Sequence, residues 1–474
     1  MKVSKILVAL MALGLMFTAC EKDFLDINKD PNSSVKVQAD LLFMGAVNEF
    51  ACSSMDFGPG MMYWSKQWAA GSTNASVFSN PEKYQMSIYS PGNVWGQVYS
   101  NLQNIEHGKK VSLESDKLND WCQLEIMKSY LVYFLTAVWE DVPYTEALQI
   151  DTYPHPKYDK QEDLLNTIVA NLTDAIAKID VTKKGFQEIL FSGDMNNWKE
   201  FGNFMKLKVL TILASKDKAK YGSQLAAFLA TSPDLFDGNE DNVKFPFYDS
   251  DGNRNPFFKL WKEYSNGKPD YYYVCDEFIA LLGNDPRAEK WFAYGKNNAG
   301  KTVDYYVGVT QGKPLPEAAT LIGPGTVNPE APFVFATYSE QEFLLAEIYV
   351  NGLAGGASVA TAQTHFEAAV KANMTQWGVT SKEADAYILG NIGSLTSAPD
   401  PVKSVYEQMY IGYYFMPAET WIHVRRTGVP AVTPPIGAVT SGLIRRWTYP
   451  TNELTTNPNI PATKALDVKA WLDK

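Results

Sequence analysis

The stretch that decides the fold is residues 339–378, which read SEQEFLLAEIYVNGLAGGASVATAQTHFEAAVKANMTQWG. Apolar and small side chains recur at intervals of three and four on both sides of a glycine-rich turn, and this is the period of an α-helix. Ser339 and Glu342 have the spacing of a capping box, which predicts that the first helix begins there. Gly378 ends the second helix. We therefore expect two helices joined by the turn at 352–356.

The small and aromatic residues of this helix pair follow the packing code of a tetratricopeptide hairpin. Small side chains let two helices approach closely, and aromatic rings fill the gap between them. The residues that carry the code are Ala346, Tyr349, Ala362, Phe366 and Ala369. The turn is longer than in that repeat, so an ordinary pair of helices is the alternative interpretation.

Helical periodicity extends along much of the chain, and one long segment interrupts it. The periodic stretches are 95–105, 121–142, 165–179 and 197–215, and a second capping-box pattern, Asp159 to Glu162, precedes the third. Residues 218–337 instead hold short clusters of Gly, Pro, Asn, Asp and Tyr, which favour short strands and long loops. We predict a mainly α protein with a helical scaffold at roughly 38–217 and 338–428 and a loop-rich ligand region at roughly 218–337.

The N-terminus has the form of a lipoprotein signal. Two lysines precede the apolar run from Ile6 to Phe17, which is shorter than the ~20 residues that span a bilayer. Small residues follow, and then Cys20, whose thiol can carry lipid. We predict a signal peptide at 1–19 and a mature chain at 20–474, tethered to a membrane outside the cytoplasm. An ordinary signal peptide followed by a chance cysteine is the alternative.

Composition argues against several classes of function. The net charge of −11 becomes −13 when the two lysines of the signal peptide leave, which disfavours nucleic acid as a partner. The remaining cysteines, Cys52, Cys122 and Cys275, match no metal motif, and the sequence leaves open whether two of them form a disulfide. No hydrolase elbow, zinc motif or phosphate loop is present, so we predict no catalytic residue, no metal site and no cofactor.

One short acidic stretch resembles the start of a calcium loop. Residues 249–253 read DSDGN, but Leu260 occupies the position of the last acidic ligand in such a loop. We interpret the stretch as a solvated turn in which Asp side chains bond to the backbone. The sequence leaves open whether a calcium ion binds.

Two aromatic stretches suit the capture of a sugar, whose ring has an apolar face and a rim of hydroxyl groups. One begins at 63 and extends to 84; the other covers 270–273 and continues to Trp291 and Tyr294. For each ring, packing in the core is the alternative. The candidate ligand-binding residues are Trp64, Trp68, Asn74, Tyr84, Tyr272, Tyr273 and Trp291. By contrast, we expect the four arginines of the C-terminal part, Arg425, Arg426, Arg445 and Arg446, to pair with structural carboxylates.

Five stretches, taken in chain order, resemble the SusD/RagB family of outer-membrane nutrient-binding lipoproteins, particularly its SusD-like branch. They are Cys20 with 23–32 (DFLDINKDPN), 139–147 (WEDVPYTEA), 285–287 (DPR), 342–347 (EFLLAE), and 421–430 with 445–450 (RRWTYP). No single stretch is decisive, but the set spans nearly the whole mature chain.

The resemblance implies a scaffold of about four tetratricopeptide-like helix pairs with an inserted loop-rich region. It implies a protein that is not an enzyme and that sits on the exterior of the outer membrane through its lipid. It also implies a partner, a SusC-like TonB-dependent outer-membrane transporter, which receives the captured oligosaccharide or peptide. A glycan is the ligand we expect. The alternatives are a peptide-capturing member of the same family, a lipid-anchored extracytoplasmic glycoside hydrolase, and a helical scaffold without a small ligand.

Overall fold

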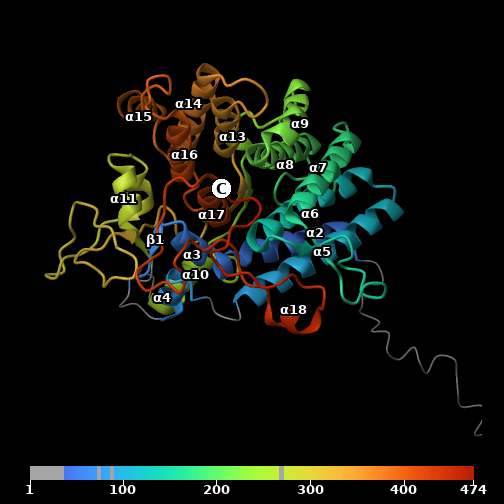
Figure 1. Cartoon of the computed structure of the whole chain (residues 1–474), viewed down its shortest axis with the longest axis horizontal. Helices are drawn as coiled ribbons and strands as arrows, with labels where there is room; N and C mark the ends of the chain where they lie inside the picture. Colours follow the sequence, from blue (N-terminus) through green and yellow to red (C-terminus); the bar gives the residue numbers. More distant parts are fainter. Residues whose placement is uncertain (1–36, 72–75, 86–89, 266–271) are drawn as a thin grey trace, which may run out of the picture. The chain divides into compact units, whose positions relative to one another are not determined.

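Four pairs of helices form the scaffold of the protein (Figure 1). In this computed structural model, residues 37–71, 76–85, 90–265 and 272–474 are described, and residues 39–474 form one compact unit. The pairs are α2 (Ala39–Cys52) with α5 (Ser90–Glu114), α6 (Leu118–Trp139) with α7 (Gln161–Lys178), α8 (Met195–Lys216) with α9 (Lys218–Ala230), and α13 (Tyr338–Asn351) with α14 (Val359–Gln376). Neighbouring pairs contact one another through α5 and α6, α7 and α8, and α8 and α13. The expected helical-repeat scaffold is confirmed.

The pair that decides the fold packs as its sequence predicts. Ala346, Ala362, Phe366 and Ala369 are completely buried between α13 and α14. Gly352 closes α13 with φ of 61°, a left-handed conformation that glycine adopts without strain.

The starts of two helices differ from the capping boxes that the sequence suggested. Thr337, which follows strand β8, caps α13: its side chain accepts a hydrogen bond from the Glu340 N–H. Ser339 lies inside that helix. Asp159 does not cap α7, because its carboxylate accepts hydrogen bonds from the backbone N–H groups of Tyr144 and Thr145 instead. At α7 the strand β3 contains Asp159, whereas at α13 the cap lies two residues before Ser339, directly after β8.

The scaffold also extends further than predicted. Helix α9 occupies 218–230, a segment that the sequence reading placed in the loop-rich region. Asp217 caps it by accepting a hydrogen bond from the Lys220 N–H. Tyr221, Leu225 and Phe228 are buried at intervals of four and three, so the helix has an apolar stripe. Clusters of polar residues before and after the stripe obscure it in the sequence.

The loop-rich region contains short antiparallel strands, as expected. A four-stranded sheet has the order β1-β5-β7-β6, in which β1 (Trp68–Ala69) and β6 (Phe292–Ala293) are the edge strands. Its two inner strands are β5 (Tyr273–Val274) and β7 (Leu321–Ile322). Two further pairs are β4 (Val243–Phe245) with β8 (Phe333–Ala336) and β2 (Val142–Pro143) with β3 (Tyr158–Asp159).

Shorter helices make up the rest of the helical structure in the described residues. They are α3 (Ser54–Trp64), α4 (Ser76–Glu82), α10 (Pro256–Ser265), α11 (Asp276–Leu282), α12 (Ala288–Trp291), α15 (Ser381–Tyr387), α16 (Pro401–Gly412), α17 (Pro417–Thr427) and α18 (Thr451–Thr456). A π-helical turn, Ile388–Ile392, continues α15. Among the described helices, none combines the length and the apolar character needed to cross a membrane.

Buried ion pairs attach the C-terminal segment to the scaffold. Arg425 pairs with Asp473, and Arg426 pairs with Glu347, and all four of these side chains are buried. Arg446 pairs with Glu140 at the end of α6. Arg445 lies at 3.9 Å from the second carboxylate oxygen of Asp473. The prediction that these arginines bind structural carboxylates is confirmed.

The three cysteines of the described chain are free thiols. Cys52 is exposed, whereas Cys122 and Cys275 are buried. The disulfide that the sequence left open is therefore not formed among them.

Candidate functional site

The two predicted aromatic stretches meet at one sheet. Strand β1 comes from the first stretch and β5 from the second, and Trp68 is paired with Val274 in the antiparallel register. The ring centroids of Trp68 and Tyr272 are 4.8 Å apart. The sequence therefore singled out segments that lie together in space.

The aromatic rings at this meeting point nevertheless fill the core. Trp64, Trp68, Tyr84, Tyr272 and Trp291 are each no more than 2% exposed, so none offers a ring face to a ligand in this structure. Trp64 packs edge-on against Trp421 and donates its indole N–H to the Pro81 carbonyl. Trp291 stacks on Tyr414 with centroids 4.4 Å apart. For these five residues the structure supports the core-packing alternative.

The two other predicted ligand residues have a different status. Tyr273 is half-buried on the inner strand β5. Asn74 lies outside the described residues. Cys20, the predicted lipidation site, also lies outside them.

Exposed aromatic rings occur instead on a hairpin that leaves the edge strand β6. We call residues 294–306 the tyrosine hairpin; it lies in the yellow loops below α11 at the left of Figure 1. Tyr294 is 37% exposed and Tyr305 is 57% exposed. The rings of Tyr294 and Tyr306 stack with centroids 4.8 Å apart and planes inclined by 28°. Tyr294 and the half-buried Tyr306 thus form a stacked pair, and Tyr305 is a further exposed ring on the same hairpin.

Backbone hydrogen bonds hold the tyrosine hairpin in shape. The Val303 N–H donates to the Gly295 carbonyl at 3.1 Å, and the Asn297 N–H donates to the Lys301 carbonyl at 2.9 Å. At the tip, the Asn297 side-chain oxygen accepts hydrogen bonds from the N–H groups of Ala299 and Lys301. The tyrosine hairpin is therefore preorganised, which lowers the entropic cost of binding a ligand there.

The stack rests on an apolar base, and the Tyr306 hydroxyl stays neutral. Phe292 on β6 packs edge-on beneath Tyr306, with centroids 5.8 Å apart. Burial and a hydrogen bond with Tyr294 raise the pKa of the Tyr306 hydroxyl above its ordinary value. A neutral phenol both donates and accepts hydrogen bonds, so the surface combines flat apolar faces with polar edges.

The sequence analysis included Tyr294 in the second aromatic stretch but did not identify Tyr305 and Tyr306. These two residues belong to the segment DYYVG at 304–308, which has no helical or strand period. Adjacent tyrosines among Gly and Asp are the signal that could have revealed them, because such a segment has no apolar stripe to bury them.

The family model SusD-like_2, which is described as "Starch-binding associating with outer membrane", matches residues 58–450. The chain belongs to the SusD-like family. This match includes the four-stranded sheet, the tyrosine hairpin and most of the helical scaffold. The resemblance inferred from five short stretches of sequence is confirmed.

Solved SusD-like structures share the fold over nearly the whole chain. A SusD homologue from Bacteroides fragilis is 22% identical and superposes with a TM-score of 0.74, covering 93% of this chain and 100% of that one. A chitin-binding SusD homologue from Flavobacterium johnsoniae is 18% identical, with a TM-score of 0.75 and coverages of 92% and 98%. A SusD homologue from Parabacteroides distasonis is 18% identical, with a TM-score of 0.76 and coverages of 92% and 97%. No curated protein sequence matches the chain.

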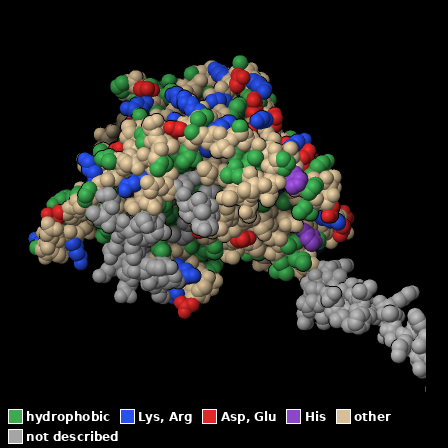
Figure 2. Space-filling model, turned by 60° about the horizontal axis from the view of Figure 1, so that its bottom comes forward, with side chains coloured by type: hydrophobic (Ala, Val, Ile, Leu, Met, Phe, Trp, Pro, Cys, Tyr) green, Lys and Arg blue, Asp and Glu red, His purple; other side chains and the backbone are tan. Residues whose placement is uncertain are grey.

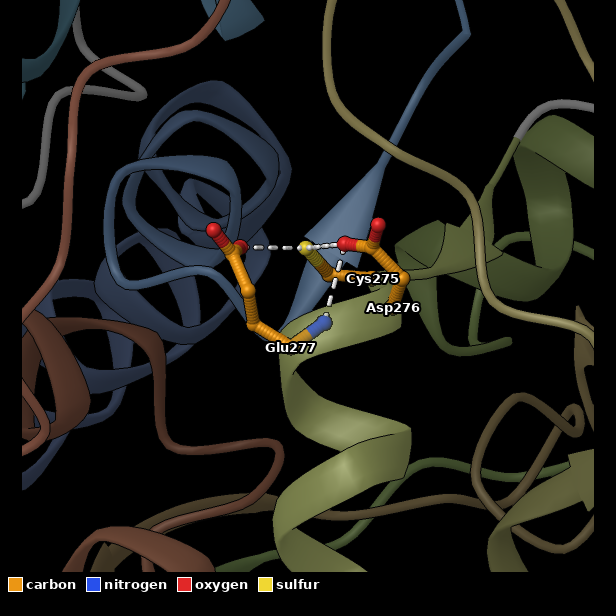
Figure 3. A group of neighbouring side chains, drawn as sticks. All are labelled: Cys275, Asp276 and Glu277. Atoms are coloured by element: carbon orange, nitrogen blue, oxygen red, sulfur yellow. Dashed lines mark hydrogen bonds between the residues drawn. The ribbon is translucent and has the colours of Figure 1, made fainter.

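One group of side chains in this SusD-like protein has the proximity that a metal site needs. Cys275, Asp276 and Glu277 bring a sulfur and two carboxylates together at the start of α11 (Figure 3). The Cys275 thiol donates to a Glu277 carboxylate oxygen at 3.1 Å. Burial raises the pKa of this thiol well above its ordinary value, whereas a metal requires the thiolate. The donor set therefore fits a hydrogen-bonded helix start better than a metal centre.

Charged neighbours reinforce this conclusion. The Lys66 ammonium lies 3.2 Å from a Glu277 oxygen, and the Thr310 hydroxyl donates to Asp276 at 2.6 Å. At the acidic stretch 249–253, the Arg254 guanidinium pairs with both Asp249 and Asp251. Asp249 and Asp251 thus meet a cation of the chain itself.

The surface of the protein is mixed in character. On the described part of the face shown in Figure 2, hydrophobic side chains form small separate groups among acidic and basic ones. Such scattered apolar residues are normal for a surface exposed to water. The tyrosine hairpin is therefore distinguished by the stacking of its rings rather than by a wide apolar area.

Proposed function

We propose that this SusD-like protein binds oligosaccharides at the outer surface of the outer membrane and delivers them to a SusC-like TonB-dependent transporter. The observation that carries the proposal is the exposed Tyr294 ring stacked on the half-buried Tyr306 ring, in a chain whose family is described as starch-binding. The fold is shared with a chitin-binding SusD homologue, which is consistent with glycan as the ligand class.

The geometry suits reversible capture of a sugar. Each pyranose ring has an apolar face that an exposed tyrosine can cover, while its hydroxyl groups meet polar groups around the ring. Asp304 and Lys296 are exposed on the tyrosine hairpin and supply such groups. A shallow, preformed surface of this kind binds without enclosing the ligand, and so it can release the ligand to a partner.

The anchoring part of the proposal rests on the sequence. Cys20 follows a short apolar run and small residues, which is the arrangement of a lipoprotein signal. A lipid there would hold the folded unit at 39–474 beside the membrane through a polar leader.

Capture without cleavage separates this function from that of a glycoside hydrolase. A hydrolase needs two carboxyl groups that flank the scissile bond, one of them protonated. Glu317, which follows the hairpin, accepts a hydrogen bond from the Asn298 N–H and thus has a structural partner. Because the family model is described as starch-binding, we infer a binding protein without catalytic activity.

The test is a titration of the purified full-length protein with maltoheptaose and chitohexaose, followed by chromatography of the glycans. We expect binding by at least one glycan and no shortened products. Replacing Tyr294 and Tyr305 with alanine should weaken binding, whereas Tyr153→Ala, at an exposed tyrosine between β2 and β3, should not. Cleavage of either glycan, or binding of peptides in place of glycans, would overturn the proposal.

A further inference from the structure

A groove of about 680 Å³ lies between α14 and the segment that contains α15 and the π-helical turn. Its size falls in the range of about 300–1,000 Å³ that is typical of small-molecule sites. It lies outside the tyrosine hairpin, since its lining residues all belong to 363–394. Neither the sequence reading nor the proposed function assigns it a role.

One wall of the groove is a polar row along α14. Gln363, Glu367 and Lys371 follow one another at intervals of four, which places them on one helix face. The Gln363 amide donates to a Glu367 oxygen at 2.6 Å and accepts from the Leu395 N–H at 2.6 Å. Gln363 thus connects the helix to the loop that ends the groove.

The opposite wall combines a carboxylate with apolar side chains. Asp385 on α15 pairs with Lys371 across the groove, at 2.7 Å. Ile388 and Leu389 follow on the π-helical turn. Leu389 is 85% exposed, more than any other large hydrophobic residue among those described.

The groove therefore presents an apolar side facing a row of donors and acceptors. The Lys371–Asp385 pair supplies a donor and an acceptor within 2.7 Å of each other, a spacing that suits two adjacent hydroxyl groups. Glu367 adds a second carboxylate, and the charged groups of the lining sum to a negative charge, which disfavours anionic ligands. A neutral polyhydroxylated ring with an apolar face matches both walls.

We propose that the groove between α14 and α15 is a second glycan-binding site, in which Leu389 covers the apolar face of a sugar and Glu367, Lys371 and Asp385 bond to its hydroxyl groups. This inference rests on the proposed function, because it assumes that the protein captures glycans. A second contact would let the protein hold a long chain at two points, and two weak sites on one ligand give a higher combined affinity than either alone.

Amide hydrogen exchange of the full-length protein can test the two sites separately. The probes are maltoheptaose and chitohexaose. The glycan that binds is added at about ten times its Kd. At this concentration the exchange of covered amides should slow by about tenfold. We expect slower exchange both in the tyrosine hairpin and in 388–394. The double variant Glu367→Gln with Leu389→Ala should lose the effect in 388–394 and keep it in the hairpin. Glu367→Gln preserves an acceptor for the Gln363 amide.

Matched changes elsewhere control for the loss of an exposed leucine and a carboxylate. Leu41→Ala on α2 and Glu330→Gln remove the same groups at exposed positions and should leave both effects intact. Slower exchange in the hairpin alone would overturn the second site while the proposed function stands. Slower exchange in neither segment, with no binding by titration, would overturn both.

Discussion

The ring of Trp68 lies against the ring of Tyr272, with centroids 4.8 Å apart and planes inclined by 34°. The contact joins an edge strand of the four-stranded sheet to the segment that leads into its neighbour, β5. Phe257 packs edge-on against the same indole, with centroids 5.8 Å apart. This aromatic group secures the loop-rich region on the scaffold and thereby supports the exposed tyrosine hairpin.

Trp68→Ala should therefore destabilise the protein. Truncating a fully buried tryptophan removes its packing and leaves a cavity, which costs about 3–5 kcal/mol of unfolding free energy. The measurement is urea-induced unfolding followed by circular dichroism. Tyr305→Ala, at an exposed ring, should change the unfolding free energy by less than about 0.5 kcal/mol. A Trp68→Ala variant of normal stability that fails to bind glycans would instead place Trp68 in the ligand site.

Tyr294→Ala should weaken glycan binding without affecting the fold. Tyr294 is partly exposed and supplies one ring of the stack, so its loss removes a contact face and the support of Tyr306. We expect a loss of about 1.4 kcal/mol, which is a tenfold rise in Kd by calorimetry. Tyr294→Phe, which keeps the ring, should retain most of the affinity. Equal losses in the two variants would show that the hydroxyl group, rather than the ring face, binds the ligand.

The helix pairs could be predicted from the sequence, but the burial of rings in the short strands could not. The α13–α14 pair was predictable because Ala346, Ala362 and Phe366 repeat with the helical period, and burial follows directly from that period. The short strands of the loop-rich region carry no such period. Trp68 lies in a strand of two residues, so nothing local separates a buried ring from an exposed one. Its burial depends on Tyr272 and Phe257, which are distant in sequence.

For the candidate site, too, the sequence located the segments but not the exposed rings within them. The sequence singled out two aromatic stretches, and the structure shows that both contribute strands to one sheet. The sequence could not tell which aromatic rings of these stretches are exposed to solvent. The exposure of a ring depends on whether it lies in the sheet or on the hairpin that extends from the edge strand β6. Tyr305 and Tyr306 therefore emerged only from the structure.

His423 should make the protein less stable as the pH falls. It is buried on α17, and burial, together with the nearby charge of Arg426, lowers its pKa from 6.5 to about 3. The folded protein thus keeps His423 neutral, while the unfolded chain binds a proton below pH 6.5. Stability is complete above that pH and falls by about 1.4 kcal/mol for each unit below it, until the pH approaches 3.

The check is a comparison of His423→Gln with the unmodified protein at pH 7.5 and pH 5.5. Glutamine can still donate to the Tyr406 carbonyl, which accepts a hydrogen bond from His423. The unfolding free energy of the variant should fall about 1.4 kcal/mol less over this interval. Burial raises the pKa of Glu340 to about 7, which gives a slope of opposite sign, but both proteins contain Glu340 and the comparison cancels it. Equal falls in the two proteins would contradict the prediction.

Cys20→Ala should release the protein from the membrane. The lipid is expected on the Cys20 thiol, so without it the folded unit has only a polar leader. In a detergent phase-partition experiment, the normal protein should enter the detergent phase and the variant the aqueous phase. Cys52→Ala, at an exposed thiol, should behave as the normal protein does. Digestion of the normal protein by protease added to intact cells would support its exterior location, and protection from the protease would contradict it.

Arg426→Met should be among the most destabilising changes at the end of α17. The guanidinium pairs with Glu347 of α13, with 2.7 Å between Nη2 and Oε2, and the two side chains are only 6% and 0% exposed. Removing the cation leaves a buried carboxylate without its partner, which costs about 3–5 kcal/mol. Lys403→Met, which breaks an exposed pair with Glu407, should cost less than about 1 kcal/mol.

The double variant Arg426→Met with Glu347→Leu separates the ion pair from simple packing. With both charges gone, no unpaired carboxylate is buried, and apolar side chains of similar length occupy the site. We therefore expect the double variant to regain most of the unfolding free energy lost by Arg426→Met, as measured in urea, because the cost lies in the stranded charge rather than in the missing contact. If the double variant were as unstable as the sum of the two single variants, packing around Arg426 would be the source of its contribution, and the ion pair would have no role in attaching α17 to α13.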